Sequence, residues 1–544
     1  MTNGPLIVQS DKTALLEVDH PLASDARHEL AIFAELERAP EHIHTYRITK
    51  LGLWNARAAG HDSDFVLGVL DRYAKFAVPT SVRTDIAETM RRYGRLVIQR
   101  DEAGELELVS NEPAVLAEAT KHRKIAELLE GRISQTAFKI LPWARGQVKQ
   151  ELLKLGWPAE DLAGYTPGTP HEIALSEGSW HIRDYQSQAV DKFWQGGSGV
   201  VVLPCGAGKT IVGAAAMSVA KTNTLILVTN TVSARQWKAE LLKRTTLTED
   251  EIGEYSGSVK EIKPITIATY QILTTKKKSE YTHLSLLNAN DWGLIVYDEV
   301  HLLPAPIFKM TADLQARRRL GLTATLVRED GKEGDVFSLI GPKRFDAPWK
   351  EIEAQGYIAP ANCFEIRIDM PEEERLDYAI ADQENRYRIA ATSPVKIAVV
   401  KKLLERHKGE PTLIIGQYLD QIHTISAALK IDEITGETPV DERERLFEQF
   451  RQGKITALVV SKVANFSVDL PEASVAIQIS GSYGSRQEEA QRLGRLLRPK
   501  ADGRSASFYT LISRDTVDQD FAQNRQRFLA EQGYSYEILD AHEL

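Results

Sequence analysis

The chain of 544 residues has little of what marks several classes of protein. It has only two cysteines, Cys205 and Cys363, and no C-x-x-C pair, which excludes a disulfide framework and argues against a cysteine-based zinc site. No apolar run approaches the roughly 18 residues that a membrane span requires, and the first residues lack the charged and then apolar pattern of a signal peptide. These absences predict a cytoplasmic protein with no membrane contact.

The chain also lacks an excess of positive charge. Lys and Arg number 67 against 76 Asp and Glu, so the formal net charge is -9. A protein that coats nucleic acid by bulk attraction would have the opposite balance, so any nucleic-acid contact must come from a local basic surface. The proportions of 43% hydrophobic and 26% charged residues are those of a folded globular chain, and the length predicts three or four domains.

Short apolar runs alternate with helical stretches from about residue 200 onward, which predicts parallel sheets covered on both faces. The first series has expected strands at 200–203, 225–228, 265–268 and 294–297 and helices at 211–220 and 233–242. A second series has strands at 412–415, 457–460, 475–479 and 507–512 and helices at 441–450 and 486–497. The fold class is therefore α/β, with two tandem lobes of the same architecture.

The regions before and between the two lobes are of a different kind. The N-terminal part predicts helices around 64–73 and 84–93 and a β-hairpin that joins 95–99 to 105–109, so we expect mixed α+β domains there. The stretch 371–392 between the lobes is charged and helix-prone and belongs to neither sheet. A solvated connecting helix is its plainest interpretation.

A glycine-rich turn follows the first expected strand of lobe one and leads into a helix. The turn and the start of the helix consist of Pro204, Cys205, Gly206, Ala207, Gly208, Lys209 and Thr210. Backbone N–H groups of such a turn can hold phosphate oxygens, Lys209 can reach the β and γ phosphates of ATP, and Thr210 can hold Mg²⁺. The strict pattern has glycine at position 203, where this chain has leucine, so the match is to a relaxed form.

Two adjacent carboxylates, Asp298 and Glu299, follow the apolar run 294–297. Nucleotides bind at the carboxyl edge of a parallel sheet, where both side chains are expected. Asp298 is placed to orient Mg²⁺ through its water shell, and Glu299 to polarise the water that attacks the γ-phosphate. A pair of solvated turn residues is the alternative for these two positions taken alone.

The helix expected at 486–497 in lobe two carries Gln491 and leads to Arg495 and Arg498. The two arginines are three positions apart and project from nearly the same side of a helix. They can face the nucleotide of lobe one as arginine fingers and neutralise charge on the transferred phosphoryl group. Alone, the segment fits an ordinary amphipathic helix equally well, and the order of all three signals favours an ATPase of two lobes.

Further segments resemble the remaining motifs of superfamily 2 helicases, in the expected order over residues 181–515. Arg183 and Gln186 lie in a segment that resembles the adenine-reading glutamine motif. The segments 229–237 (TNTVSARQW) and 267–271, with Thr269 and Tyr270, resemble two strand-gripping motifs. Thr323, Ala324 and Thr325 resemble the motif that couples ATP to DNA. Segment 414–418, which includes Gln417, resembles the fourth motif, and segment 460–470, which includes Asp469, resembles the fifth. The resemblance implies RecA-like lobes that use ATP and Mg²⁺.

Features outside the ATPase segments resemble the XPB family of DNA helicases. Arg328, Glu329 and Asp330 look like the Arg-Glu-Asp element that this family uses in duplex opening. The stretch 371–392 sits where the family carries a thumb-like insertion, in which Arg386 and Arg388 are candidate DNA contacts. Segment 147–151 resembles its damage-recognition region and 42–49 its N-terminal domain. The long extensions of eukaryotic members are absent from this chain.

The resemblance implies the following division: an N-terminal XPB-like domain at 1–125, a damage-recognition-like region at 126–180, helicase lobe one at 181–360, the thumb-like insertion at 361–394 and lobe two at 395–544. It implies a 3′-to-5′ DNA helicase in nucleotide excision repair that acts on single-stranded, forked or damaged DNA, with a nuclease as a candidate partner. A duplex-DNA translocase that does not separate strands is the main alternative. An RNA helicase, a restriction-enzyme motor subunit and a scaffold with an inactive ATPase remain further alternatives.

Overall fold

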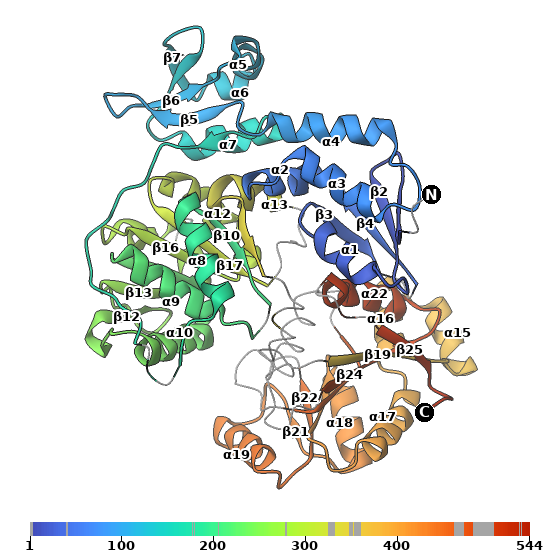
Figure 1. Ribbon diagram of the computed structural model, residues 1–544. Coiled ribbons are helices and arrows are strands. Elements are labelled where there is room, and N and C mark those ends of the chain that lie inside the picture. The colour runs from blue at the N-terminus through green and yellow to red at the C-terminus, as the bar shows by residue number, and fades with distance from the viewer. Residues whose placement is uncertain are drawn as a thin grey trace.

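The computed structural model of the chain describes residues 4–39, 42–176, 178, 180–204, 206–277, 280–324, 332–347, 352, 361–461, 473–481, 505–531, 534 and 536–544. These residues form two N-terminal units with largely antiparallel sheets and two larger lobes with parallel sheets (Figure 1). Within the described ranges, no helix combines the length and the apolar character that crossing a bilayer requires.

The N-terminal unit is a four-stranded antiparallel sheet of order β1-β2-β4-β3, covered by four helices. Its strands are β1 (Leu6–Val8), β2 (Thr13–Glu17), β3 (Ala34–Arg38) and β4 (Ile43–Ile48). Its helices are α1 (Ala23–Leu30), α2 (Lys50–Ala58), α3 (Ser63–Tyr73) and α4 (Thr80–Arg92). The helices expected around 64–73 and 84–93 are confirmed as α3 and α4.

A second unit is built on a five-stranded sheet of order β7-β8-β6-β5-β9. Its strands are β5 (Val97–Arg100), β6 (Leu106–Val109), β7 (Leu129–Arg132), β8 (Ala137–Ile140) and β9 (Glu160–Asp161), and its helices are α5 (Pro113–Thr120), α6 (Arg123–Ala126) and α7 (Arg145–Lys154). The predicted hairpin is confirmed, since β5 and β6 pair antiparallel with Val97 opposite Val109. This sheet takes strands from both sides of residue 125.

Lobe one is a seven-stranded sheet of order β12-β13-β11-β16-β17-β10-β18, in which every pair of neighbours is parallel. Its strands are β10 (Gly199–Val202), β11 (Thr224–Val228), β12 (Ile252–Tyr255), β13 (Ile265–Thr269), β16 (Leu294–Asp298), β17 (Arg318–Thr323) and β18 (Lys343–Asp346). Its main helices are α8 (Asp184–Gly196), α9 (Lys209–Ala220), α10 (Thr231–Arg244), α11 (Tyr270–Thr274) and α12 (Ala305–Thr311). All residues of β11 and β13 are buried, as expected of strands covered on both faces. All four predicted strands and both helices are confirmed.

Lobe two repeats this architecture with a parallel sheet of order β21-β22-β20-β23-β24-β19-β25. Its strands are β19 (Ala361–Ile368), β20 (Thr412–Gly416), β21 (Glu433–Ile434), β22 (Ala457–Ser461), β23 (Val475–Gln478), β24 (Ala506–Ser513) and β25 (Tyr536–Asp540). Its helices are α17 (Val395–Arg406), α18 (Leu419–Leu429), α19 (Val440–Arg451) and α22 (Val517–Glu531). The stretch between the lobes forms two helices, α15 (Glu372–Ile380) and α16 (Gln383–Ala391), that belong to neither sheet.

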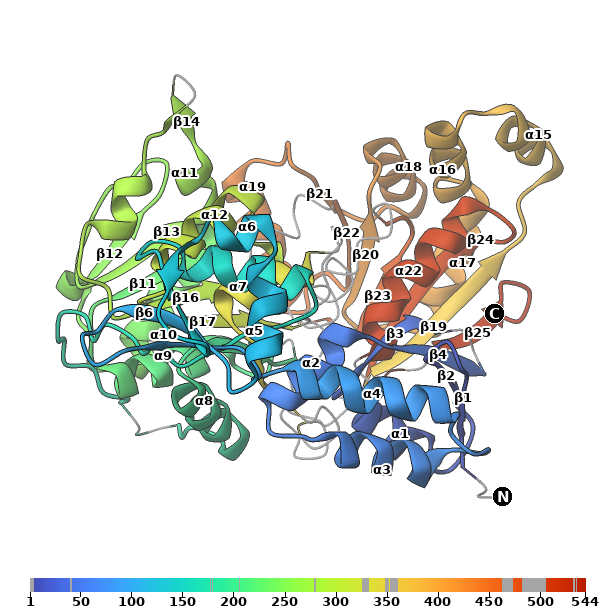
Figure 2. The same cartoon turned by 90° about the horizontal axis from the view of Figure 1, so that it is seen from above.

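The N-terminal unit contacts both lobes (Figure 2). On lobe one, the side-chain oxygen of Asn55 accepts a hydrogen bond of 2.8 Å from the backbone N–H of Lys343 on the edge strand β18. On lobe two, Ala530 of α22 belongs to the hydrophobic core of the N-terminal unit. The sheet edge at β18 is thereby covered, which removes an unpaired strand from solvent.

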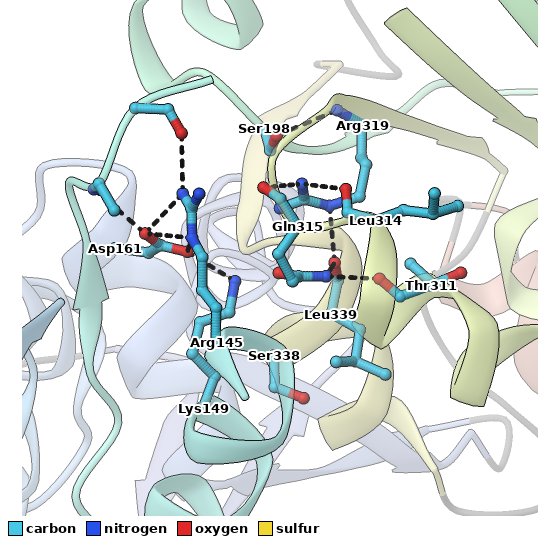
Figure 3. Close-up of polar contacts among 12 residues, drawn as sticks. Arg145, Lys149, Asp161, Ser198, Thr311, Leu314, Gln315, Arg319, Ser338 and Leu339 are labelled. Atoms are coloured by element: carbon cyan, nitrogen blue, oxygen red, sulfur yellow. Dashed lines mark hydrogen bonds and ion pairs between the residues drawn. The ribbon is translucent and has the colours of Figure 1, made fainter. Parts of the chain in front are cut away.

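The second unit docks on lobe one through α7 (Figure 3). A side chain at Gly146 would place its Cβ 2.6 Å from the carbonyl oxygen of Ala312, so this close approach requires glycine. Next to it, Arg145 and Lys149 both bond Asp161, with Lys149 Nζ 2.8 Å from Asp161 Oδ2. Lys149 is 7% exposed and lies beside lobe one, so this member of the segment 147–151 is part of an internal joint.

Candidate nucleotide site

The glycine-rich turn joins β10 to α9 at the carboxyl edge of the lobe-one sheet. Gly206 and Gly208 have φ values of 82° and 83°, in the left-handed region that favours glycine. A Cβ at Gly208 would lie 2.4 Å from Gln186 Nε2, so packing against α8 also requires glycine there. The turn therefore brings the backbone close to the start of a twelve-residue helix, the arrangement that binds phosphate groups.

Lys209 and Thr210 form the first turn of α9, as expected. The Lys209 ammonium makes an ion pair with the Glu299 carboxylate, and these side chains are only 14% and 19% exposed. The structure thus brings together the loop lysine and the second carboxylate, which are 90 positions apart in the chain. An ammonium shielded from water in this way interacts strongly with anionic oxygens.

Asp298 ends β16, and its carboxylate is held at both oxygens. Oδ1 accepts the backbone N–H of Glu299 at 3.1 Å, and Oδ2 accepts the indole N–H of Trp237 at 2.9 Å. Burial, together with the neighbouring charge of Glu299, raises the pKa of Asp298 to about 6, although Lys209 and the indole favour the ionised form. The Asp298 carboxylate is therefore fixed in orientation, and a nearby cation would stabilise its ionised form.

Glu299 adopts left-handed backbone angles with φ of 49°, an unusual conformation for a residue with a side chain. Burial alone would raise its pKa, but the charges of Lys209 and His301 and hydrogen bonds from Lys209 and the Ala324 backbone outweigh it. The pKa of Glu299 is therefore lowered. At neutral pH the side chain is a carboxylate that can accept a proton.

His301 connects Glu299 to the end of β17. Its Nδ1 lies 2.6 Å from the Thr323 hydroxyl and 3.5 Å from Glu299 Oε2. Thr323 and Ala324 are both buried, at 0% and 4% exposure. Glu299 is thus linked to the segment that resembles the coupling motif, through His301 and the Ala324 backbone.

Arg183 and Gln186 lie at the start of α8, beside the glycine-rich turn. Gln186 Nε2 donates to the carbonyl of Ala207 at 2.9 Å, and its Oε1 accepts the backbone N–H of Arg183. The Tyr185 hydroxyl donates to the same Ala207 carbonyl at 2.7 Å. Gln186 therefore supports the turn, and its expected contact with adenine stays a prediction.

The residues expected to contact DNA have different surroundings. Thr269 caps α11, and the Tyr270 hydroxyl donates to the Asp298 carbonyl at 2.8 Å, so both side chains are buried. Arg386 donates to the carbonyl of Ala379, while Arg388 is exposed and pairs with Asp420 at 2.7 Å. The side-chain oxygen of Gln417 is buried with no hydrogen-bond partner among the described residues, and its backbone N–H donates to the Ser480 hydroxyl at 2.8 Å. DNA contact by these five residues stays a prediction.

Several expected site residues lie outside the described ranges: Cys205, Thr325, Arg328, Glu329, Asp330, Asp469, Gln491, Arg495 and Arg498. Their assigned roles in nucleotide binding, phosphoryl transfer and duplex opening stay predictions.

The donor groups at this edge suit magnesium and a nucleoside triphosphate. One ammonium and two carboxylates lie together beside the turn that begins α9, and Thr210 is in the first turn of that helix. Hard oxygen donors are the ligands that Mg²⁺ prefers, and a lysine with helix N–H groups is suited to phosphate. Thr210 and Asp298 are the side chains that would hold such a metal; this role stays a prediction.

Three family models match separate parts of the chain. Residues 352–543 match the ERCC3/RAD25/XPB C-terminal helicase, and residues 179–328 match the res subunit of type III restriction enzymes. Residues 6–134 match a model described as a helicase conserved C-terminal domain. The XPB family is therefore named by the model that matches lobe two and not by the model that matches lobe one.

Curated relatives match over the full length. A DNA 3′-5′ helicase XPB of Kineococcus radiotolerans is 68% identical over 544 residues, covering 100% of this chain and 98% of that protein. The protein of the same description from Mycobacterium tuberculosis is 63% identical and covers 100% and 99%. The chain belongs to the XPB family of DNA helicases. The XPB/SSL2 subunit of the general transcription and DNA repair factor IIH of Saccharomyces cerevisiae is 32% identical, with 98% of this chain and 72% of that one covered.

Two side chains of this XPB-family site were not identified from the sequence. Trp237 is the last residue of segment 229–237, and the structure places it in the core, with its indole N–H on Asp298. His301 lies two positions after Glu299 in the chain, and it bonds Thr323. The spacing of Trp237 with Ala234 and Leu241 could have indicated a buried helix face, but no sequence signal indicates that its partner is Asp298.

Proposed function

We propose that this chain is an ATP-driven DNA helicase that moves 3′ to 5′ and opens duplex DNA, within DNA repair by nucleotide excision. The observation that carries the proposal is the joint placement of Lys209, Asp298 and Glu299 beside the glycine-rich turn. Membership in the XPB family supports DNA as the polymer on which the motor acts.

The chemistry proposed for lobe one follows from its charges. Lys209 binds the β and γ phosphates, and the backbone N–H groups of the turn orient them. Glu299, ionised at neutral pH, orients the attacking water and accepts its proton. Thr210 and Asp298 hold Mg²⁺, which when bound neutralises charge on the phosphates.

Lobe two completes the proposed site with Arg495 and Arg498, which act as arginine fingers on the transferred phosphoryl group. Gln186 contacts the base, and Arg183, Asp469 and Gln491 also bind ATP. The contact between Glu299, His301 and Thr323 supports the proposal that hydrolysis is transmitted to the coupling segment 323–325. The segment 328–330 then acts in duplex opening.

The proposal is tested by unwinding of tailed duplexes. The chain should separate a duplex with a 3′ single-stranded tail in the presence of ATP and Mg²⁺, and should leave a duplex with a 5′ tail intact. If neither substrate opens while duplex DNA still stimulates ATP hydrolysis, the helicase proposal fails and a duplex translocase replaces it. RNA-stimulated hydrolysis that is insensitive to DNA would overturn both.

The biological setting is a further part of the proposal. We place the protein in the cytoplasm, where forked and damaged DNA are its substrates, and a nuclease that cuts the opened strand is the proposed partner. Co-purification of a nuclease with the wild-type chain, lost when segment 42–49 or 371–392 is altered, would support that partnership.

A further inference from the structure

Asp298 is held by two buried aromatic side chains, one from each of the two segments of lobe one that resemble strand-gripping motifs. Trp237 comes from 229–237 and bonds the carboxylate, while Tyr270 comes from 267–271 and bonds the backbone carbonyl. The two segments follow different strands, β11 and β13, which pair with each other. Asp298 is therefore in direct contact with both segments.

Trp237 occupies the inward-facing side of α10. The buried residues of this helix are Ala234, Trp237 and Leu241, which recur at the spacing of one helix face. Trp237 is 2% exposed, and its indole N–H donates to Asp298 Oδ2 at 2.9 Å. A buried indole N–H needs a partner, and here that partner is a carboxylate, which makes a strong charge-assisted bond.

The packing around the indole fixes its position. A Cβ at Gly213 on α9 would lie 2.4 Å from Trp237 Cη2, so the ring fills a space that only glycine leaves open. The helices α9 and α10 pack side by side at this point (Figure 1). One side chain thus touches the helix that begins with Lys209 and the carboxylate at the end of β16.

Tyr270 fixes the backbone of Asp298 from the other segment. It is 4% exposed, and its hydroxyl donates to the Asp298 carbonyl at 2.8 Å. Thr269, immediately before it, caps α11 by accepting the backbone N–H of Ile272. The position of the hydroxyl is therefore set by the start of α11.

The outer sides of the same two segments are polar and open to solvent. Arg235 on α10 and Gln271 on α11 are exposed. At the start of α10, the half-buried Thr229, Asn230 and Ser233 are joined by hydrogen bonds of 2.9 to 3.3 Å. Hydroxyl, amide and guanidinium groups of this kind bind a phosphodiester backbone.

We propose that Trp237 and Tyr270 are positioning residues that link the nucleic-acid-facing segments of lobe one to Asp298, so that DNA and ATP change one another's affinity through these two hydrogen bonds. The inference rests on the proposed function, because it assigns a route to a coupling that only a DNA-stimulated ATPase has. It concerns Asp298 alone and is separate from the contact between His301 and Thr323.

The test measures binding as well as hydrolysis. The Kd of a fluorescent single-stranded DNA is measured with and without a non-hydrolysable ATP analogue and Mg²⁺ for the wild type, Trp237→Phe, Tyr270→Phe and the double variant. Coupled sites change each other's affinity by about 5- to 150-fold. We expect a ratio in this range for the wild type, and a ratio within about twofold of unity for the double variant, because phenylalanine keeps the ring and removes only the donor.

Steady-state hydrolysis gives the second readout. In the double variant, the ratio of the DNA-stimulated rate to the DNA-free rate should fall by about tenfold or more, the loss typical of a removed donor to a charged group. Matched controls are Trp292→Phe, which removes the indole bond to the Leu286 carbonyl, and Tyr297→Phe, which removes the hydroxyl contact with Thr311. Both side chains are fully buried in the same lobe, and both controls should keep the wild-type coupling.

Three outcomes overturn the inference. The first is wild-type coupling in both single variants and the double variant. The second is an equal fall of the DNA-free and DNA-stimulated rates, which assigns Trp237 and Tyr270 to the shape of the site and not to coupling. The third is an equal loss of coupling in the Trp292→Phe and Tyr297→Phe controls. A wild type with no DNA-stimulated hydrolysis is a different result, which refutes the proposed function itself.

Discussion

Two buried groups of charged residues in this molecule differ in their excess charge, which is positive in one group and negative in the other. The joint between the second unit and lobe one has three cations, Arg145, Lys149 and Arg319, around the single carboxylate of Asp161. The nucleotide site has one lysine, Lys209, beside two carboxylates. In both, a lysine ammonium bonds a carboxylate, so the ion pair alone does not distinguish a structural joint from a reactive site.

The difference lies in what surrounds each pair. At the joint, Arg319 donates to the carbonyls of Leu339 and Gln315 at 2.8 Å, and Arg145 to that of Gly164 at 3.0 Å (Figure 3). The chain's own dipoles thus satisfy the surplus positive charge. At the nucleotide site the surplus is negative and lies beside a glycine-rich turn, which suits a divalent cation and its phosphates.

The pKa values of the two groups follow the same contrast. Burial and the nearby charges of Arg319 and Arg145 lower the pKa of Lys149 to about 7, despite its bond to Asp161. Burial and the charge of Glu299 raise the pKa of Asp298 to about 6. In each group, one residue whose charge has the sign of the excess, Lys149 or Asp298, is shifted toward its neutral form.

The largest expected effect is a loss of stability on removing the Asp161 carboxylate at the joint. Asp161→Asn leaves Arg145 and Lys149 buried without a negative partner, and breaking a buried pair in this way costs about 3–5 kcal/mol of unfolding free energy. Urea denaturation followed by circular dichroism measures the loss. Glu160→Gln changes the half-buried neighbouring carboxylate and should cost less than about 1 kcal/mol; equal losses would mean that Asp161 has no special role.

Removing the lysine of the nucleotide site should affect activity far more than stability. We expect Lys209→Ala to reduce ATP hydrolysis by about 100- to 1000-fold, because an ammonium aimed at the phosphates is lost from a shielded site. A thermal melt should show a smaller loss than for Asp161→Asn, because the carboxylates left without Lys209 can take up a proton, and the pKa of Asp298 is already raised to about 6. If Lys209→Ala still hydrolyses ATP at the wild-type rate, the glycine-rich turn has only a structural role.

The pH dependence of stability should depend on Lys149. Its folded-state pKa of about 7 lies below the ordinary 10.5, so between these values the unfolded chain binds the additional proton and stability rises with pH. The contribution is at most about 1.4 kcal/mol per pH unit. We expect Lys149→Met to flatten the rise of unfolding free energy measured at pH 7, 8 and 9. Lys154→Met, on the exposed side of the same helix, should keep the wild-type slope; if both slopes match, the lysine is not held in its neutral form.

The smallest effect is expected at the contact between the nucleotide site and β17. Thr323→Val removes the hydroxyl that bonds His301 and should cost about 1 kcal/mol, the net value of one hydrogen bond. If the contact transmits hydrolysis, strand separation per ATP hydrolysed falls several-fold while the hydrolysis rate stays near wild type. An unchanged ratio of separation to hydrolysis would remove Thr323 from the coupling route.

The lobes were predictable because their buried strands are continuous apolar runs between helices. Strands β19 and β25 were not, since β19 pairs with β24 across more than a hundred residues and no local pattern marks that pairing. The glycine-rich turn and the carboxylates 298 and 299 were found from residue type and order. The Trp237 contact was not, because it depends on how α10 packs against α9.

The burial of Lys149 in segment 147–151 is another feature that the sequence alone could not predict. Its resemblance to a damage-recognition region suggests a surface, yet Lys149 is buried because Asp161 returns beside α7 twelve positions later. Sequence order cannot indicate that return, since β9 is only two residues long and carries no alternating pattern.

The most direct test of the account is the ATP hydrolysis rate of the wild-type chain measured without nucleic acid and with single-stranded DNA, forked DNA and RNA. The account predicts a low basal rate, strong stimulation by both DNA substrates and weak stimulation by RNA, all lost in Lys209→Ala. A rate that no nucleic acid changes, or one that only RNA raises, would contradict it.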